Sequence, residues 1–171
     1  MNPKKLNKIL FLCTGNSARS IIAEYILQKK GHGRYEACSA GANPTGKVNP
    51  LAIWVLKDRY GIDAHEARSK SWDEFKDVVF DFVITVCDHA REMCPVWPGQ
   101  PVIAHWGSPD PAAFEGTDGQ RKLHFIQVAS QISQRINLLC ALPDEKLQSL
   151  AVRQIGDKFK IEGEKATVRS E

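Results

Sequence analysis

A short cluster of residues near the N-terminus has the types and spacing of an anion-binding nucleophile. Cys13 follows the apolar run 9–12, and Arg19 comes six positions later, ahead of a helical pattern. Gly15 and Asn16, between them, tolerate the backbone angles of a tight loop. Backbone N–H groups of such a loop converge on an anion at a helix N-terminus. Cys13 is therefore a candidate nucleophile, and the planar guanidinium of Arg19 suits a tetrahedral oxyanion.

The same surroundings predict a reactive thiol at Cys13. A thiolate beside a guanidinium at a helix N-terminus has a lowered pKa, so more of it is nucleophilic at neutral pH. Ser20 is expected to donate a hydrogen bond to that thiolate. A buried structural cysteine with a solvent-exposed arginine would not require this spacing. The expected oxyanion-binding residues are Thr14, Gly15, Asn16, Ser17, Ala18, Arg19 and Ser20.

The loop resembles that of the low-molecular-weight protein tyrosine phosphatases, whose signature is a cysteine, five residues, an arginine and a serine near the N-terminus. The resemblance covers roughly residues 8–142. One branch of this family hydrolyses phosphotyrosine, and another, the three-cysteine arsenate reductases, reduces arsenate to arsenite. Cys87 and Cys94 favour the second branch, since the resemblance implies two further cysteines with this spacing after the next long core strand.

The resemblance to the reductases also implies a cysteine relay. Cys13 attacks arsenic, Cys87 attacks the sulfur of Cys13, and Cys94 forms the final disulfide with Cys87. Asp110, in an Asp-Pro step, matches the general acid of the family, although the dipeptide alone is equally typical of a turn aspartate that bonds its own loop amides. No bound cofactor is expected. An external donor, thioredoxin or glutaredoxin with a low-molecular-weight thiol, would restore the cysteines.

Some members of the family hold a potassium ion near the loop through an asparagine, a glutamate, a serine and an acidic segment. Asn16, Glu24 and Ser39 match the first three. The later segment, 68–70, reads Arg-Ser-Lys and contains no acid. We therefore expect Lys70 to supply the positive charge, and no metal to bind there.

Two other functions remain open on the sequence. The first is a phosphotyrosine phosphatase, which would bind phosphate in the same loop and leave Cys87 and Cys94 idle. The second is a metal-binding protein that uses Cys87, His89, Cys94 and His105, although their spacing is not that of a zinc finger or ribbon. Replacing Cys87 separates a relay from a phosphatase, because only the relay needs that thiol.

Hydrophobic patterns predict how these residues are brought together. Apolar runs predict strands at 8–12, 35–40, 82–86 and 102–104, and helical spacing predicts helices at 18–30, 50–60 and 119–142. The alternation favours an α/β fold, a three-layer domain with a four-stranded parallel sheet and helices on both faces. Cys13, Cys87 and Asp110 then follow the carboxyl ends of strands, where ligands bind. Trp106 is expected to wall the site, and the long helix to bury Leu123, Ile126, Ala129, Ile136 and Leu139.

Composition sets the remaining limits. The 171 residues, 43% of them hydrophobic, suffice for one domain, which we expect at 1–142, with a helical extension and a polar, mobile tail at 143–171. The net charge of +3 comes without a basic stripe, so a nucleic-acid partner is not expected, and no run is long enough for a signal peptide or membrane span. Five cysteines without framework spacing suit a reducing cytoplasm. We expect a monomer.

Overall fold

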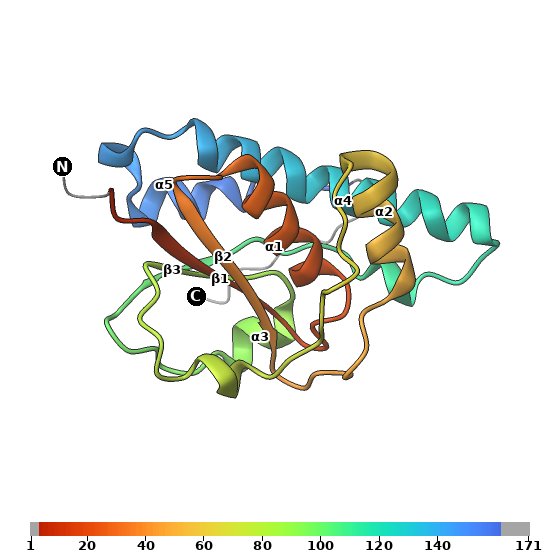
Figure 1. The fold of residues 1–171 in the computed structure, drawn as a ribbon, viewed down its shortest axis with the longest axis horizontal. Helices are drawn as coiled ribbons and strands as arrows, with labels where there is room; N and C mark the ends of the chain where they lie inside the picture. Colours follow the sequence, from red (N-terminus) through yellow and green to blue (C-terminus); the bar gives the residue numbers. More distant parts are fainter. Residues whose placement is uncertain (1–3, 162–171) are drawn as a thin grey trace.

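A computed structural model of the chain describes residues 4–161 (Figure 1). Its sheet has four parallel strands in the order β2-β1-β3-β4. The predicted strands are confirmed, each within a residue or two of its expected ends. They are β1 Asn7–Cys13, β2 Tyr35–Gly41, β3 Phe82–Thr85 and β4 Val102–His105.

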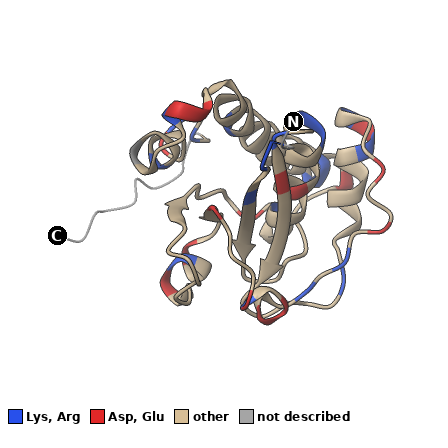
Figure 2. Cartoon of the chain, turned by 60° about the vertical axis from the view of Figure 1, so that its left-hand side comes forward, with Lys and Arg blue, Asp and Glu red and all other residues tan. Residues whose placement is uncertain are grey.

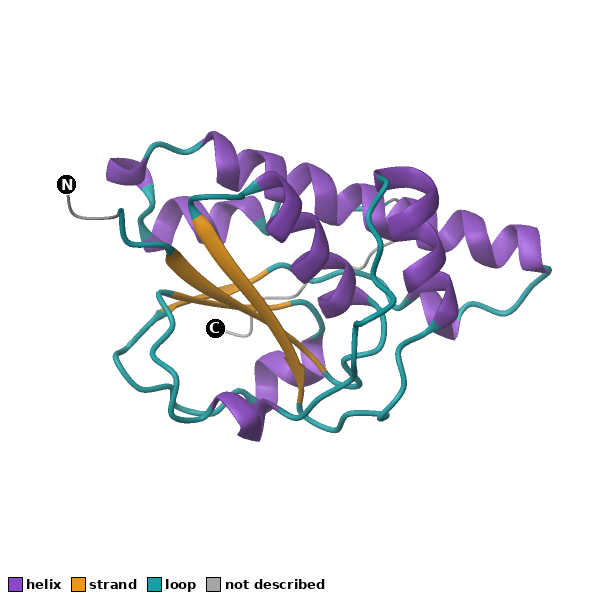
Figure 3. Cartoon of the chain, in the orientation of Figure 1, coloured by secondary structure: helices purple, strands orange, loops and turns teal. Residues whose placement is uncertain are grey.

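Helices cover both faces of this sheet, as predicted. Figures 1 and 3 show α1, α4 and α5 on one side and the short α3 on the other. The central strand β1 is apolar and fully buried over residues 9–12, as a strand covered on both faces requires. The helices are α1 Arg19–Lys30, α2 Pro50–Tyr60, α3 Asp88–Met93, α4 Asp118–Ala141 and α5 Ser149–Ile155.

Local sequence signals set the helix ends. Asn49 caps α2 by accepting a hydrogen bond from the Leu51 N–H at 2.9 Å, and Pro50 takes the first helical position. Thr117 and Gln120 form a capping box that starts α4. Ser71 also acts as a cap, but the helix that it begins is one 3-10 turn, Trp72–Phe75.

Two expectations about apolar residues are wrong. Leu123 lies on α4 but is 57% exposed, because the first turns of that helix extend beyond the sheet. Trp106 is buried in the core beside Phe11, and its indole N–H donates to the Val152 carbonyl at 2.9 Å. This hydrogen bond joins α5 to the residue that follows β4, and Trp106 does not line the site.

In the C-terminal extension, α5 packs against β4, the strand at one edge of the sheet. Residues 162–171 of the expected mobile tail lie outside the described part of the chain. In the cartoon of Figure 2, most positions of charged residues fall on helices and connecting loops, and the strands carry few of them. Within residues 4–161, none of the helices has the length and apolar character needed to span a membrane.

Candidate active site

The loop between β1 and α1 has its peptide carbonyls turned away from Cys13. The carbonyls of Cys13, Thr14 and Gly15 accept hydrogen bonds from the N–H groups of residues 42, 43 and 45, at 2.9–3.1 Å. Because the C=O and N–H of a peptide point in opposite directions, the following N–H groups face the thiol. One of them, from Asn16, lies 3.2 Å from Cys13 Sγ. At least this one N–H of the predicted anion cradle therefore faces the thiol.

Asn16 fixes the shape of this cradle. It is fully buried with a φ of 46°, a left-handed conformation that asparagine tolerates better than most residues. Its amide group donates to Ser20 Oγ at 2.8 Å and to Ser39 Oγ at 3.0 Å, and accepts from the Lys70 backbone N–H at 2.9 Å. Gly41 lies directly behind, where a Cβ atom would come within 2.5 Å of the Thr14 carbonyl oxygen.

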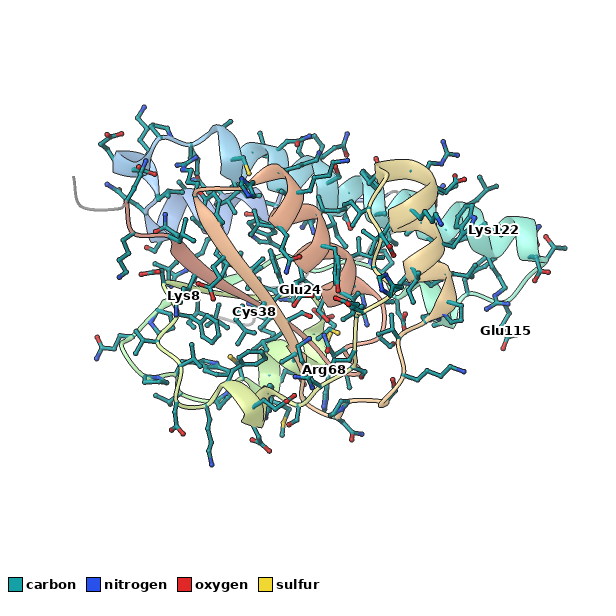
Figure 4. The ribbon with its side chains drawn as sticks, in the orientation of Figure 1. Lys8, Glu24, Cys38, Arg68, Glu115 and Lys122 are labelled. Atoms are coloured by element: carbon teal, nitrogen blue, oxygen red, sulfur yellow. The ribbon has the colours of Figure 1, made fainter. Side chains whose placement is uncertain are left out.

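A buried ion pair lies near Asn16, and Lys70, the residue expected to supply a positive charge here, is its cation. Lys70 Nζ is 3.8 Å from a Glu24 carboxylate oxygen and 3.3 Å from Ser39 Oγ, and both charged side chains are at most 10% exposed. Figure 4 labels Glu24 on α1, next to the strand that carries Cys38. Burial raises the pKa of Glu24, against the lowering effects of Lys70 and Ser39. The lysine thus supplies the positive charge that this polar cluster requires.

Arg19 and Asp110 meet on the open side of the loop. The Arg19 guanidinium donates to the Ser108 carbonyl at 2.9 Å and lies 3.9 Å from an Asp110 carboxylate oxygen. Asp110 also accepts a hydrogen bond from the Ala112 N–H at 3.0 Å and caps the 3-10 turn Pro111–Ala113. Asp110 therefore caps this turn and also lies beside Arg19. A half-exposed carboxylate here can exchange a proton with a ligand held by Arg19.

The thiol of Cys13 differs from the sequence prediction in its acidity. Its Sγ lies 2.8 Å from Ser20 Oγ, as expected, and the side chain is only 3% exposed. Burial raises the pKa of the Cys13 thiol above its ordinary value and outweighs the lowering effects of Ser20, Arg19 and Asn16. The expectation of a lowered pKa is therefore wrong for this closed site, because residue spacing carries no measure of desolvation.

Cys87 lies next to the loop that holds Cys13. Its Sγ is 3.3 Å from Thr14 Oγ1, and the side chain is 7% exposed. Cys87 lies two residues after the end of β3 and is the N-cap of α3, where its Sγ accepts a hydrogen bond from the Ala90 N–H at 3.4 Å. The expected placement at the same sheet edge as Cys13 is confirmed.

Cys94 sits at the other end of α3 and is half-buried. Its thiol donates weakly to the Pro95 carbonyl at 3.7 Å, and burial raises the pKa of this thiol against a smaller lowering effect of the Trp97 side chain. All five cysteines are free thiols in this structure. Burial raises the pKa of the Cys38 thiol to about 11 and also raises that of Cys140.

A cavity of about 820 Å³ joins most of these groups. Arg19, Cys87, Cys94 and Asp110 line it, whereas Cys13 is not among its lining residues. The C-terminal extension also lines it, through Arg153, Gly156, Asp157, Lys160 and Ile161. A ligand held by Arg19 would therefore lie in the same space as both additional cysteines.

Sequence reasoning assigned no role in the reaction site to two residues that shape it. His105 joins β4 to α3, since its ring contacts Thr85 Oγ1 at 2.8 Å and Asp88 at 3.1 Å, and burial lowers its pKa. Arg135 is fully buried on α4 and donates to the Gly107 carbonyl at 2.8 Å and the Gly156 carbonyl at 2.9 Å. The sequence did contain a signal for Arg135, because this arginine stands at a position of α4 where the helical spacing calls for an apolar residue.

A metal site is not assembled from the residues that suggested one. Among residues 4–161, no three His, Cys, Asp or Glu side chains are placed to hold an ion. His105 instead bonds Asp88, and Cys87 faces Thr14. The zinc arrangement of Cys87, His89, Cys94 and His105 is therefore not formed.

Known proteins are similar to this chain both in sequence and in fold. Residues 8–150 match the family of low molecular weight phosphotyrosine protein phosphatases. An arsenate reductase of Halalkalibacterium halodurans is 41% identical over 128 residues, which are 75% of this chain and 91% of that protein. A solved arsenate reductase in its phosphate-binding state is 30% identical with a TM-score of 0.68, over 80% of this chain and 98% of the other.

A thioredoxin-dependent arsenate reductase of Corynebacterium glutamicum is also similar, with 27% identity and a TM-score of 0.60. The match covers 80% of this chain and 61% of that protein. The resemblance inferred from residues 13–20 is thereby confirmed over most of the chain. By its sequence match, its sheet and its cysteine loop, this chain belongs to the low-molecular-weight phosphotyrosine protein phosphatase family.

Proposed function

We propose that this protein reduces arsenate to arsenite through Cys13, Cys87 and Cys94. The observation that carries the proposal is the position of Cys87, whose Sγ lies 3.3 Å from the hydroxyl of Thr14 in the Cys13 loop. A phosphatase has no use for a second thiol at this place. The arsenate reductases among the similar proteins support the same reaction.

The loop and Arg19 hold the oxyanion. Arsenate resembles phosphate in shape and charge, and the N–H groups facing Cys13 would bind its oxygens. Cys13 attacks arsenic, an As–S bond forms, and an As–O bond breaks. Asp110, 3.9 Å from the guanidinium of Arg19, protonates the leaving hydroxide.

The relay then supplies two electrons. The Cys87 thiolate attacks the sulfur of Cys13, an S–S bond forms, and arsenite leaves with the As–S electron pair. Cys94 next attacks Cys87, which frees Cys13 and moves the disulfide to Cys87 and Cys94. Arsenic is reduced by two electrons, and two thiols are oxidised to one disulfide.

Helix α3 must unwind for the last step. Seven residue steps of an α-helix separate Cys87 from Cys94, or about 10 Å along its axis. A disulfide needs Cα atoms within about 7 Å. Only Ala90 of this six-residue helix is fully buried, so little packing opposes the change.

The donor that reduces the final disulfide is external in this proposal. Thioredoxin is favoured because a similar reductase from Corynebacterium glutamicum is thioredoxin-dependent. Glutaredoxin with a low-molecular-weight thiol is the other candidate. Five free cysteines suit a reducing cytoplasm, and we infer a monomer that works there.

Phosphatase activity is the second candidate function, because the same cradle, Arg19 and Asp110 would serve phosphomonoester hydrolysis. Arsenite formed per enzyme molecule, with thioredoxin and its reductase present, distinguishes the two. Cys94→Ser should yield at most one equivalent, while Cys38→Ser, the matched control, should turn over repeatedly. Repeated turnover by Cys94→Ser would refute the last relay step.

A further inference from the structure

Trp97, three residues after Cys94, carries a buried donor that is left without a partner. Its side chain is 4% exposed, and its indole N–H has no hydrogen-bond acceptor among the described residues. A buried unsatisfied donor costs about 1–3 kcal/mol, and buried tryptophans usually find an acceptor. The N–H therefore calls for a partner that this state of the protein does not supply.

Aromatic packing fixes the ring independently of α3. The Phe80 ring lies edge-on to Trp97, with centroids 5.9 Å apart, and Phe75 packs on Phe80 at the same separation. Val96, between Trp97 and the helix end, is fully exposed. The indole is therefore packed into the core through Phe80.

The nearby sulfur is the group that can become that acceptor. The indole N–H acts on the Cys94 thiol and lowers its pKa, against the larger raising effect of burial. A neutral thiol is a weak acceptor, which explains why no full hydrogen bond is formed. A thiolate is charged, and hydrogen bonds to charged groups are shorter and stronger.

We propose that Trp97 is a positioning residue whose indole N–H binds the Cys94 thiolate and presents it for attack on Cys87. The inference rests on the relay proposed above. In that step the Cys13–Cys87 disulfide breaks, the Cys87–Cys94 disulfide forms, and Cys13 takes the electron pair as thiolate. The indole changes no electron count. It raises the fraction of Cys94 that is ionised before α3 unwinds.

The test measures Cys94 alone. In a full-length chain with its other four cysteines replaced by serine, iodoacetamide labelling is followed from pH 6 to 10. Trp97→Phe keeps the aromatic packing and loses the N–H, so labelling at pH 7 should slow about tenfold and the pH midpoint should rise. Trp72→Phe, the matched control, should change neither.

An unchanged pH midpoint in Trp97→Phe would overturn the proposal. If Trp97→Phe loses its cooperative unfolding transition, benzothienylalanine at position 97 keeps the bicyclic shape without the N–H and gives the same comparison. Labelling needs no arsenate, so its outcome is independent of the reaction. A shifted midpoint in a protein whose turnover ignores Cys94 would refute the relay while leaving the indole–thiolate contact intact.

Discussion

Removing the positive charge beneath the cradle should destabilise the protein and disturb the loop. In Lys70→Ala the Glu24 carboxylate loses a partner 3.8 Å away, at a place where both side chains are at most 10% exposed. At an effective dielectric constant of about 20, that separation corresponds to about 4 kcal/mol. Breaking one half of a buried pair typically costs about 3–5 kcal/mol, so the two values agree.

The loss should depend on pH in a defined direction. Burial already raises the pKa of Glu24, and losing Lys70 removes its main lowering influence, so this pKa rises further in the variant. A carboxyl group whose pKa is higher in the folded than in the unfolded protein stabilises the folded state at pH values below its unfolded pKa. That stabilisation is lost as the pH rises through the folded pKa. The deficit of Lys70→Ala should therefore be largest near pH 8 and shrink toward pH 5.

Urea unfolding at several pH values measures this deficit. The double variant Glu24→Gln with Lys70→Met removes both charges together and should recover most of the lost stability. Hydrolysis of para-nitrophenyl phosphate by Lys70→Ala should also fall, because Ser39, which accepts a hydrogen bond from Asn16, loses the Lys70 ammonium as a second donor. A single variant within 1 kcal/mol of the parent at pH 8 would refute the reasoning.

Other residues give equally direct predictions. Ser20→Ala removes a donor to Cys13 Sγ, so the pKa of that thiol rises further and the acidic limb of the pH profile of kcat/KM should move to higher pH. An unmoved limb would count against a Cys13 thiolate that is stabilised by Ser20. Asp110→Asn keeps the cap on 111–113 and should lower kcat by about 100-fold or more, with arsenate binding retained; near-normal kcat would exclude Asp110 as the acid. Arg135→Met leaves buried carbonyls without a donor and should cost about 3 kcal/mol in urea unfolding, whereas the partly exposed Arg121→Met should cost under about 1 kcal/mol. Equal losses would contradict the burial argument.

The loop could be predicted from sequence because its parts are contiguous. Cys13, Gly15, Asn16 and Arg19 fall within seven residues, and the apolar strand before them fixes where the loop starts. Lys70 could be predicted as well, because the segment that carries it lacks the acid expected there. The helix start predicted at residue 50 is likewise confirmed, because Asn49 caps α2 there.

Long-range contacts and desolvation could not be predicted in this way. The bond from Arg135 to the Gly107 carbonyl joins residues 28 positions apart, and the Trp106 bond to Val152 joins residues 46 apart. The raised pKa of Cys13 depends on how completely the fold covers the thiol, which residue spacing does not encode. Leu123 has the right periodicity for the core, but its side chain is 57% exposed on a part of α4 that extends beyond the sheet.

The most direct test of the relay is arsenate-dependent NADPH consumption with purified protein, thioredoxin and thioredoxin reductase. Steady consumption that needs every component, and that Cys87→Ser abolishes while Cys140→Ser retains it, is the predicted result. Steady consumption by Cys87→Ser would contradict the account, because arsenite would then form without the thiol that lies beside Thr14.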